Sequence, residues 1–98
     1  MTSQLLALAA GYFLCSAAAE EQVLPKAKID ECNAIYTQLK LSFTDVESLD
    51  QFLSLVKDER AEVNRQGYAG YVNWLEENPE LVASLRNEAR LNLYRFNF

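Results

Sequence analysis

The sequence predicts an all-α protein in which an N-terminal apolar helix is followed by a small bundle, or an extended hairpin, of three to four amphipathic helices. Two observations support this fold class. Residues 1–19 contain no charged side chain, whereas residues 20–98 hold all 14 acidic and all 9 basic residues. Within residues 20–98, apolar side chains recur at spacings of three and four, the period of an α-helix. We therefore predict an apolar membrane-anchor or signal segment (1–19) and an acidic helical domain (20–98).

The apolar segment 1–19 fits two kinds of targeting element. As a signal peptide it has an apolar stretch at residues 5–14, with Ala17 and Ala19 preceding a cleavage site before Glu20. As a retained membrane helix it offers about eighteen residues, against the roughly twenty that span a bilayer. A stripe of small side chains would let a neighbouring helix approach closely in lipid. The stripe consists of Ser3, Ala7, Gly11, Cys15 and Ala19. Both interpretations stay open.

Two amphipathic helices are predicted in the middle of the chain. The first covers residues 25–40, because Pro25 cannot continue the helix before it. Its apolar face holds Ile29, Cys32, Tyr36 and Leu39. The second helix is predicted to begin at a capping box formed by Thr44 and Glu47, and to end at Gly67. Its apolar stripe consists of Val46, Leu49, Leu53, Val56 and Val63.

A short aromatic segment and a last helix complete the prediction. The aromatic segment covers residues 68–77. Asn78, Pro79 and Glu80 then have the order expected at a helix start: a capping side chain, a proline in the first turn, and an acid near the positive end of the dipole. The predicted buried face of this helix consists of Leu81, Val82, Leu85, Ala89, Leu93 and Phe96.

The composition argues against catalysis and against nucleic-acid binding. The chain has a net charge of −5 and no histidine, which removes histidine-dependent nucleophiles and imidazole ligation of metals or haem. Its acidic clusters are predicted to be solvated helix surfaces rather than a paired acid–base site or a calcium loop. An acidic chain also lacks the clustered cations that a phosphate backbone requires. We therefore expect no enzyme, no cofactor, no metal and no nucleic-acid partner.

The two cysteines are predicted not to pair with each other. Cys15 lies in the apolar segment, so that Cys32 is the single thiol of residues 20–98. Cys32 falls on an apolar helix face beside Asp30 and Glu31, which disfavour a thiolate, and we predict a buried structural cysteine. Without a covalent staple, a domain of this size has a marginal core. Support from a partner chain is therefore expected.

Three groups of residues are candidates for contact with a partner. The small residues of the apolar segment are Ala7, Gly11 and Cys15. The aromatic residues, which belong either to the bundle core or to a recognition surface, are Tyr68, Tyr71 and Trp74. The C-terminus is locally basic and apolar, and it either packs back on the bundle or docks elsewhere. Its candidates are Arg86, Arg90, Tyr94, Arg95, Phe96 and Phe98.

The C-terminal segment resembles the second helix of the PsbQ family, the extrinsic four-helix proteins on the lumenal side of photosystem II. Leu85, Arg86, Ala89, Tyr94 and Asn97 fit that family's Leu-Arg-x-x-x-Ala pattern with its later Tyr and Asn. The likeness covers about fourteen of 98 residues, and the chain ends where the family has two further helices. The resemblance implies a helical accessory protein on the lumenal side of a membrane.

Two functions are consistent with these features. The first is a non-catalytic accessory subunit of a larger membrane-associated complex, attached to the membrane through residues 1–19 and partnered by other subunits. The alternative is a secreted or lumenal helical binding module that is cleaved near Ala19, with a PsbQ-like extrinsic protein as one form of it. Glu20 and Glu21, rather than a basic flank, follow the apolar segment. We therefore expect the helical part on the lumenal, periplasmic or intermembrane side.

Overall fold

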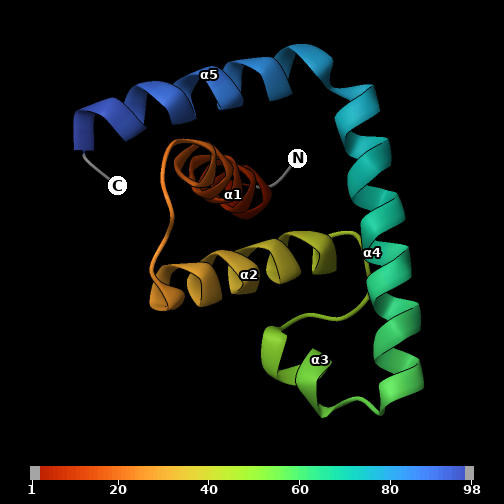
Figure 1. Cartoon of the computed structure of the whole chain (residues 1–98). Helices are drawn as coiled ribbons and strands as arrows, with labels where there is room; N and C mark the ends of the chain where they lie inside the picture. The colour runs from red at the N-terminus through yellow and green to blue at the C-terminus, as the bar shows by residue number, and fades with distance from the viewer. Residues whose placement is uncertain (1–2, 97–98) are drawn as a thin grey trace.

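The computed structural model describes residues 3–96, and this part of the chain consists of α-helices and their connections, with no β-strand (Figure 1). The helices are α1 (Ser3–Glu21), α2 (Lys26–Leu41), α3 (Leu49–Ser54), α4 (Lys57–Glu77) and α5 (Pro79–Phe96). Together they form a helical bundle. The predicted all-α fold class is confirmed, and the bundle rather than the extended hairpin is formed.

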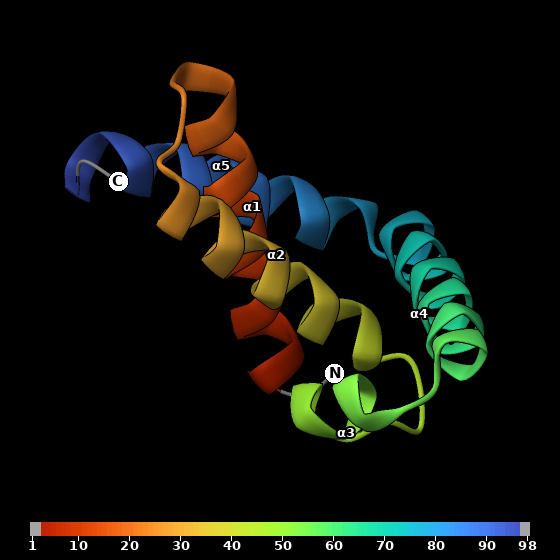
Figure 2. The same ribbon diagram turned by 60° about the horizontal axis from the view of Figure 1, so that its bottom comes forward.

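The apolar helix α1 lies in the middle of the bundle, between α2 and α5 (Figures 1 and 2). Its buried residues Leu5, Ala9 and Phe13 belong to the main core cluster, and Ala9 is 0% exposed. Near its C-terminal end, Ala17 and Ala18 form a second cluster with Leu93 of α5. A helix that is apolar on all sides is stable in water only when other elements surround it. In this chain, α2 and α5 surround much of α1.

The membrane-anchor prediction for residues 1–19 is not confirmed. No helix within residues 3–96 combines the length and the apolar composition needed to cross a membrane. What the structure shows for residues 3–19 is a packed helix of the bundle core.

A disulfide between Cys15 and Cys32 joins α1 to α2, with their Cα atoms 5.9 Å apart. The prediction that these cysteines do not pair is therefore wrong. It assigned Cys15 to a segment separate from the rest of the fold, whereas the packing of α1 on α2 brings the two thiols together. At Gly11, an added Cβ would lie 3.7 Å from Cγ2 of Ile35. Gly11 and Cys15 of the small-residue stripe thus face a neighbouring helix of the same chain.

The segment after α2 differs from the predicted long helix. Thr44 does not cap a helix, because the helix after α2 begins only at Leu49. Its hydroxyl donates to the carbonyl oxygen of Leu41 at 2.9 Å and accepts from the amide of Val46 at 3.2 Å, within a turn. The helix start lies further on, at Ser48, whose side-chain oxygen accepts a hydrogen bond of 3.0 Å from the amide of Gln51. Thr44 and Ser48 are both good capping residues. The turn that ends α2 occupies Thr44, and the short helix α3 therefore begins after Ser48.

Helix α4 continues through Gly67, and the predicted helix end at this glycine is wrong. A Cβ atom at Gly67 would lie 2.6 Å from the carbonyl oxygen of Lys40, at the end of α2. A Cβ atom at Gly70 would collide with Cβ of Phe43 in the following turn. The two glycines therefore let α4 approach the α2 end of the bundle closely, and this packing is preferred to a helix stop.

Helix α5 begins at Pro79, as predicted. The side-chain amide of Asn78 donates to the carbonyl oxygen of Trp74 at 2.9 Å, and so provides a hydrogen-bond partner for a carbonyl group in the last turn of α4. Val82, Ala89 and Leu93 are buried, in agreement with the predicted face. The side chain predicted for this face at Phe96 lies outside the described part of the structure.

Candidate functional site

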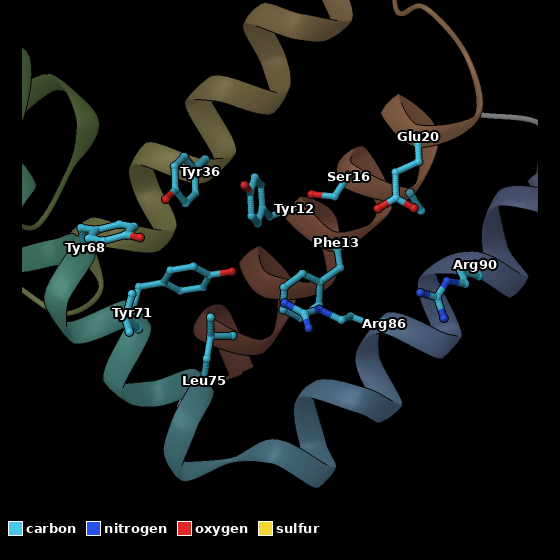
Figure 3. Close-up of a pocket in the computed structure, with 12 residues that line it drawn as sticks. Tyr12, Phe13, Ser16, Glu20, Tyr36, Tyr68, Tyr71, Leu75, Arg86 and Arg90 are labelled. Carbon is cyan, nitrogen blue, oxygen red and sulfur yellow. The ribbon is translucent and has the colours of Figure 1, made fainter.

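A partly open pocket of about 460 Å³ lies between α1, α2, α4 and α5 (Figure 3). We call it the tyrosine pocket. Its polar and aromatic lining consists of Tyr12, Phe13, Ser16, Glu20, Tyr36, Tyr68, Tyr71, Arg86 and Arg90, and its remaining lining of Ala17, Val72 and Leu75. Helix α4 packs on the end of α2 and then turns into α5, and the pocket occupies the space that this course leaves beside α1.

Three tyrosine rings from three helices form one aromatic wall of the pocket. The ring of Tyr12 on α1 stacks on Tyr36 of α2, with centroids 4.4 Å apart. The ring of Tyr71 on α4 meets both edge-on, at 6.3 Å from Tyr12 and 5.9 Å from Tyr36. Lys40 lies over Tyr36 at 4.4 Å from the ring centroid. Stacked and edge-on contacts of this kind fix the ring orientations.

The hydroxyl groups of these tyrosines are free to interact with a ligand. Within residues 3–96, no hydrogen bond joins Tyr12, Tyr36, Tyr68 or Tyr71 to another protein group through its hydroxyl. In the same part of the chain, no buried side-chain nitrogen or oxygen lacks a hydrogen-bond partner. The unpartnered hydroxyls must therefore reach solvent, and Figure 3 shows those of Tyr12, Tyr36 and Tyr71 gathered around the pocket.

Burial raises the pKa of two of these hydroxyls above the ordinary tyrosine value, which already lies well above neutral pH. Desolvation, reinforced by neighbouring tyrosines, raises the pKa of Tyr71 to about 12, and the positive charge of Arg86 opposes part of this rise. Burial also raises the pKa of Tyr36, with Tyr12 adding to the effect. Both side chains therefore present neutral O–H groups, which can donate or accept a hydrogen bond.

One end of the pocket carries two guanidinium groups from α5. The Cζ atom of Arg86 lies over the ring of Phe13, 5.1 Å from its centroid. Among the described residues, the ion pairs are formed by Lys26, Lys28 and Arg65, and neither Arg86 nor Arg90 is paired with a carboxylate. Glu20, at the end of α1, is the acidic residue of the lining.

The polar and charged groups of the pocket are the phenolic hydroxyls, the hydroxyl of Ser16, the carboxylate of Glu20 and the guanidinium groups of Arg86 and Arg90, set beside aromatic faces. Groups of these kinds can bind a ligand through hydrogen bonds, charge and ring stacking. Within residues 3–96, no group of three or more His, Cys, Asp or Glu side chains is arranged to hold a metal ion.

The predicted contact residues have different positions in the structure. Tyr71 and Trp74 are buried at 6% exposure and belong to the core, whereas Tyr68 is 53% exposed at the pocket. Gly11 and Cys15 contact α2, and Ala7 is exposed. Arg86 and Arg90 line the pocket, and Tyr94 is 75% exposed on α5. The side chains of Arg95 and Phe96, and all of Phe98, lie outside the described residues.

Sequence reasoning did not identify Tyr12 and Tyr36 as site residues, although the sequence contains a signal for the pocket. Each of the three glycines is followed directly by a tyrosine, in the pairs at residues 11–12, 67–68 and 70–71. Each glycine faces α2 or the turn after it, and each tyrosine lines the pocket. Successive helical residues are about 100° apart around the axis. When a glycine packs against α2 or the turn after it, the next side chain therefore points to the neighbouring side of the helix, where the tyrosine pocket lies.

No family model, no curated protein and no solved structure matches this chain. The PsbQ family is therefore not shown for it, and the function has to be inferred from its own residues.

Proposed function

We propose that this protein is a non-catalytic helical binding module of an oxidising, non-cytoplasmic compartment, and that it binds its ligand in the tyrosine pocket. The disulfide between Cys15 and Cys32 is the observation that carries the proposal. Such bonds persist in secreted, periplasmic and lumenal proteins, and cellular thiol systems keep cytosolic cysteines reduced. A structural disulfide therefore favours the secreted or lumenal alternative.

The proposal departs from the sequence-based alternative in one respect: residues 3–21 stay in the working protein. Cleavage before Glu20 would remove Cys15 and almost all of α1. The core would lose Leu5, Ala9 and Phe13, which pack against α2, α4 and α5 residues. Deleting one large buried side chain commonly costs about 2–5 kcal/mol, which is a large part of the stability of a small domain.

The tyrosine pocket supports a binding role. Its volume of about 460 Å³ lies in the range of roughly 300–1,000 Å³ that ligand sites occupy. It combines apolar walls with a few polar groups that have no partner within the protein, as ligand pockets commonly do. Four helices contribute to the pocket, so the fold has to be complete before the site exists.

Mass spectrometry and folding together test this proposal. The mature protein should be isolated from its native or a related host without reductant, and its intact mass measured before and after reduction. We expect a chain that includes residues 3–21 and gains two hydrogen atoms on reduction. A parallel comparison uses the full chain and a variant that begins at Glu20. We expect the truncated variant to lose its cooperative thermal transition by circular dichroism. A mature chain that begins at Glu20 and melts cooperatively would exclude the proposal.

A second candidate, the accessory subunit of a larger complex, is favoured by exposed apolar side chains on α5. Leu91 is 54% exposed and Tyr94 is 75% exposed, and both lie outside the pocket. A subunit interface would cover such side chains. Native electrophoresis of gently solubilised material, with Leu91→Ser and Tyr94→Ser variants, tests this candidate. The wild-type chain should migrate with a larger assembly and the variants should be released. Migration of the wild-type chain alone would rule it out.

A further inference from the structure

We propose that the tyrosine pocket binds a small aromatic carboxylate, with the carboxylate at Arg86 and Arg90 and the aromatic body against the tyrosine rings. This inference rests on the proposed binding function and names the class of ligand. Three features of the pocket support it: the two unpaired guanidinium groups, the wall of three aromatic rings and the tyrosine hydroxyls that have no protein partner.

The charge of the ligand follows from the two arginines. The chain as a whole is acidic, with a net charge of −5, yet Arg86 and Arg90 outnumber Glu20 in the pocket. The guanidinium of Arg86 lies over the ring of Phe13, so its position is supported from one side while its N–H groups remain available. A planar guanidinium can donate two parallel hydrogen bonds to a carboxylate.

The hydroxyl of Tyr71 supports the placement of the ligand's carboxylate at Arg86. Burial raises the pKa of Tyr71 to about 12, and the positive charge of Arg86 opposes part of that rise. The two groups therefore lie within electrostatic reach of each other, and in Figure 3 the Tyr71 hydroxyl points toward the side of the pocket that holds Arg86. A carboxylate bound by Arg86 can accept a further hydrogen bond from Tyr71, which is protonated at neutral pH.

The aromatic body of the ligand follows from the pocket wall. Tyr12 and Tyr36 stack on each other, and Tyr71 meets them edge-on, so the rings are already held in place and lose little side-chain freedom when a flat ligand binds. The available volume of about 460 Å³ is adequate for a body of one or two rings.

A single negative charge fits this pocket better than a doubly charged phosphate ester. Glu20 lies in the lining, and the surrounding protein is acidic, so each additional negative charge on the ligand adds repulsion. An aromatic cation is the opposite possibility, since tyrosine faces and Glu20 attract ammonium groups. The two arginines disfavour it, and the binding test includes it as a probe.

The test uses the full, disulfide-bonded chain and three probes with the same two-ring body. They are 2-naphthoate, neutral 2-naphthalenemethanol and a 2-naphthyl trimethylammonium salt. Binding is measured by isothermal titration calorimetry at low ionic strength. We expect naphthoate to bind about tenfold or more tightly than the alcohol, because a charged hydrogen bond is worth roughly 1.5–3 kcal/mol. The ammonium probe should bind most weakly. Equal affinities for naphthoate and the alcohol, or tighter binding of the cation, would overturn the assignment.

Variants locate the site. Arg86→Met keeps an unbranched side chain of similar length and removes the charged group that lies over Phe13. It should weaken naphthoate binding about tenfold and weaken binding of the alcohol much less. Arg90→Gln, at an exposed position, provides a second variant with little risk to folding and should weaken naphthoate binding about threefold. The matched control is Arg65→Gln, which removes one positive charge from the exposed ion pair with Glu62, outside the pocket.

The outcomes separate this inference from the proposed function. If naphthoate fails to bind, or if Arg65→Gln weakens it as much as Arg86→Met and Arg90→Gln do, the ligand class is wrong. Retention of residues 3–21 and of the disulfide is unaffected by that result, and the binding module then requires another ligand. Conversely, a mature chain that begins at Glu20 and melts cooperatively refutes the proposed function whatever the full chain binds. Circular dichroism of each variant confirms that it is folded before binding is compared.

Discussion

The two sides of α1 differ in how closely the rest of the protein approaches them. On the α2 side, small residues allow close packing: Gly11 faces Ile35, and Cys15 is bonded to Cys32 with 5.9 Å between Cα atoms. On the α4 side, the large ring of Tyr12 stands between the helices and meets Tyr71 at a centroid distance of 6.3 Å. One helix therefore has a closed seam and an open pocket on neighbouring faces.

Helix α4 shows the same contrast. Gly67 and Gly70 let it contact the end of α2 and the following turn, while Tyr68 and Tyr71 line the pocket. The comparison teaches that side-chain size, alternating between adjacent residues, decides where this bundle is closed and where it is hollow. Breaking the close contact between α1 and α2 should lower the stability most, and removing a tyrosine hydroxyl should lower it least.

The largest effect is expected from breaking the disulfide. A Cys15→Ser/Cys32→Ser variant should lose about 3 kcal/mol of unfolding free energy, because the bond closes a loop with a sequence separation of 17 residues. Urea denaturation followed by circular dichroism measures the loss. Reductant should destabilise the wild-type chain similarly and leave the variant unchanged. An unfolding midpoint that is the same in both proteins would show that the bond does not support the seam.

A smaller loss is expected at the contact between α4 and α2. Gly67→Ala should destabilise the protein by about 2 kcal/mol, because its Cβ would lie 2.6 Å from the carbonyl oxygen of Lys40 and the backbone would have to move. The gain in helix propensity offsets part of this cost. Thermal and urea denaturation provide the measurement. If the alanine variant were more stable than wild type, the two helices would not be in contact at this position.

Gly11→Ala is the matched substitution in α1, and its effect should have the opposite sign. Its Cβ would lie 3.7 Å from the nearest atom of Ile35, an ordinary van der Waals distance. Alanine is a better helix former than glycine, so we expect a gain of up to about 1 kcal/mol. The same denaturation experiments measure it. A loss comparable to that of Gly67→Ala would mean that α1 and α2 lie closer together than described.

The smallest effect concerns the pH dependence contributed by the pocket. Because burial raises the pKa of Tyr71 to about 12 from an unfolded value near 10, the folded state holds this proton more tightly. The resulting stability is fully present below about pH 10 and is lost as the pH rises through about 12. Solvent in the open pocket screens the effect, which should stay below about 1 kcal/mol.

Tyr71→Phe isolates this contribution. Melting temperatures of the variant and the wild type should be compared between pH 9 and 12, and the wild type should lose more stability over this interval. The pKa of Tyr36 is raised as well, so ultraviolet titration of the folded wild type should show one more late-ionising tyrosine than the variant. Identical pH profiles of stability would indicate that Tyr71 is well hydrated.

Several elements of the fold are predictable from the sequence because their signals are local. Pro25 precedes α2, and Pro79 begins α5, since proline restricts the backbone in the same way wherever the chain goes. The candidate site is predictable only in part. Tyr68, Tyr71, Arg86 and Arg90 attract attention as aromatic and basic residues. The Gly-Tyr pairs mark places where a helix packs closely beside a large ring, but a local pattern cannot show which of these places meet in the fold.

The sequence by itself determined the helical content of this protein, the buried face of its last helix and the uncharged, mostly apolar character of residues 1–19, because these properties depend on residues a few positions apart. The faces predicted with Ile29, Leu53 and Val56 were wrong at these positions, where the side chains are exposed. Tertiary structure alone decided that the apolar helix lies inside the bundle, that its cysteine meets Cys32, and that a tyrosine pocket remains beside it. The physical reason is that an apolar helix can be buried equally well by lipid or by protein. Only the packing of distant helices distinguishes the two.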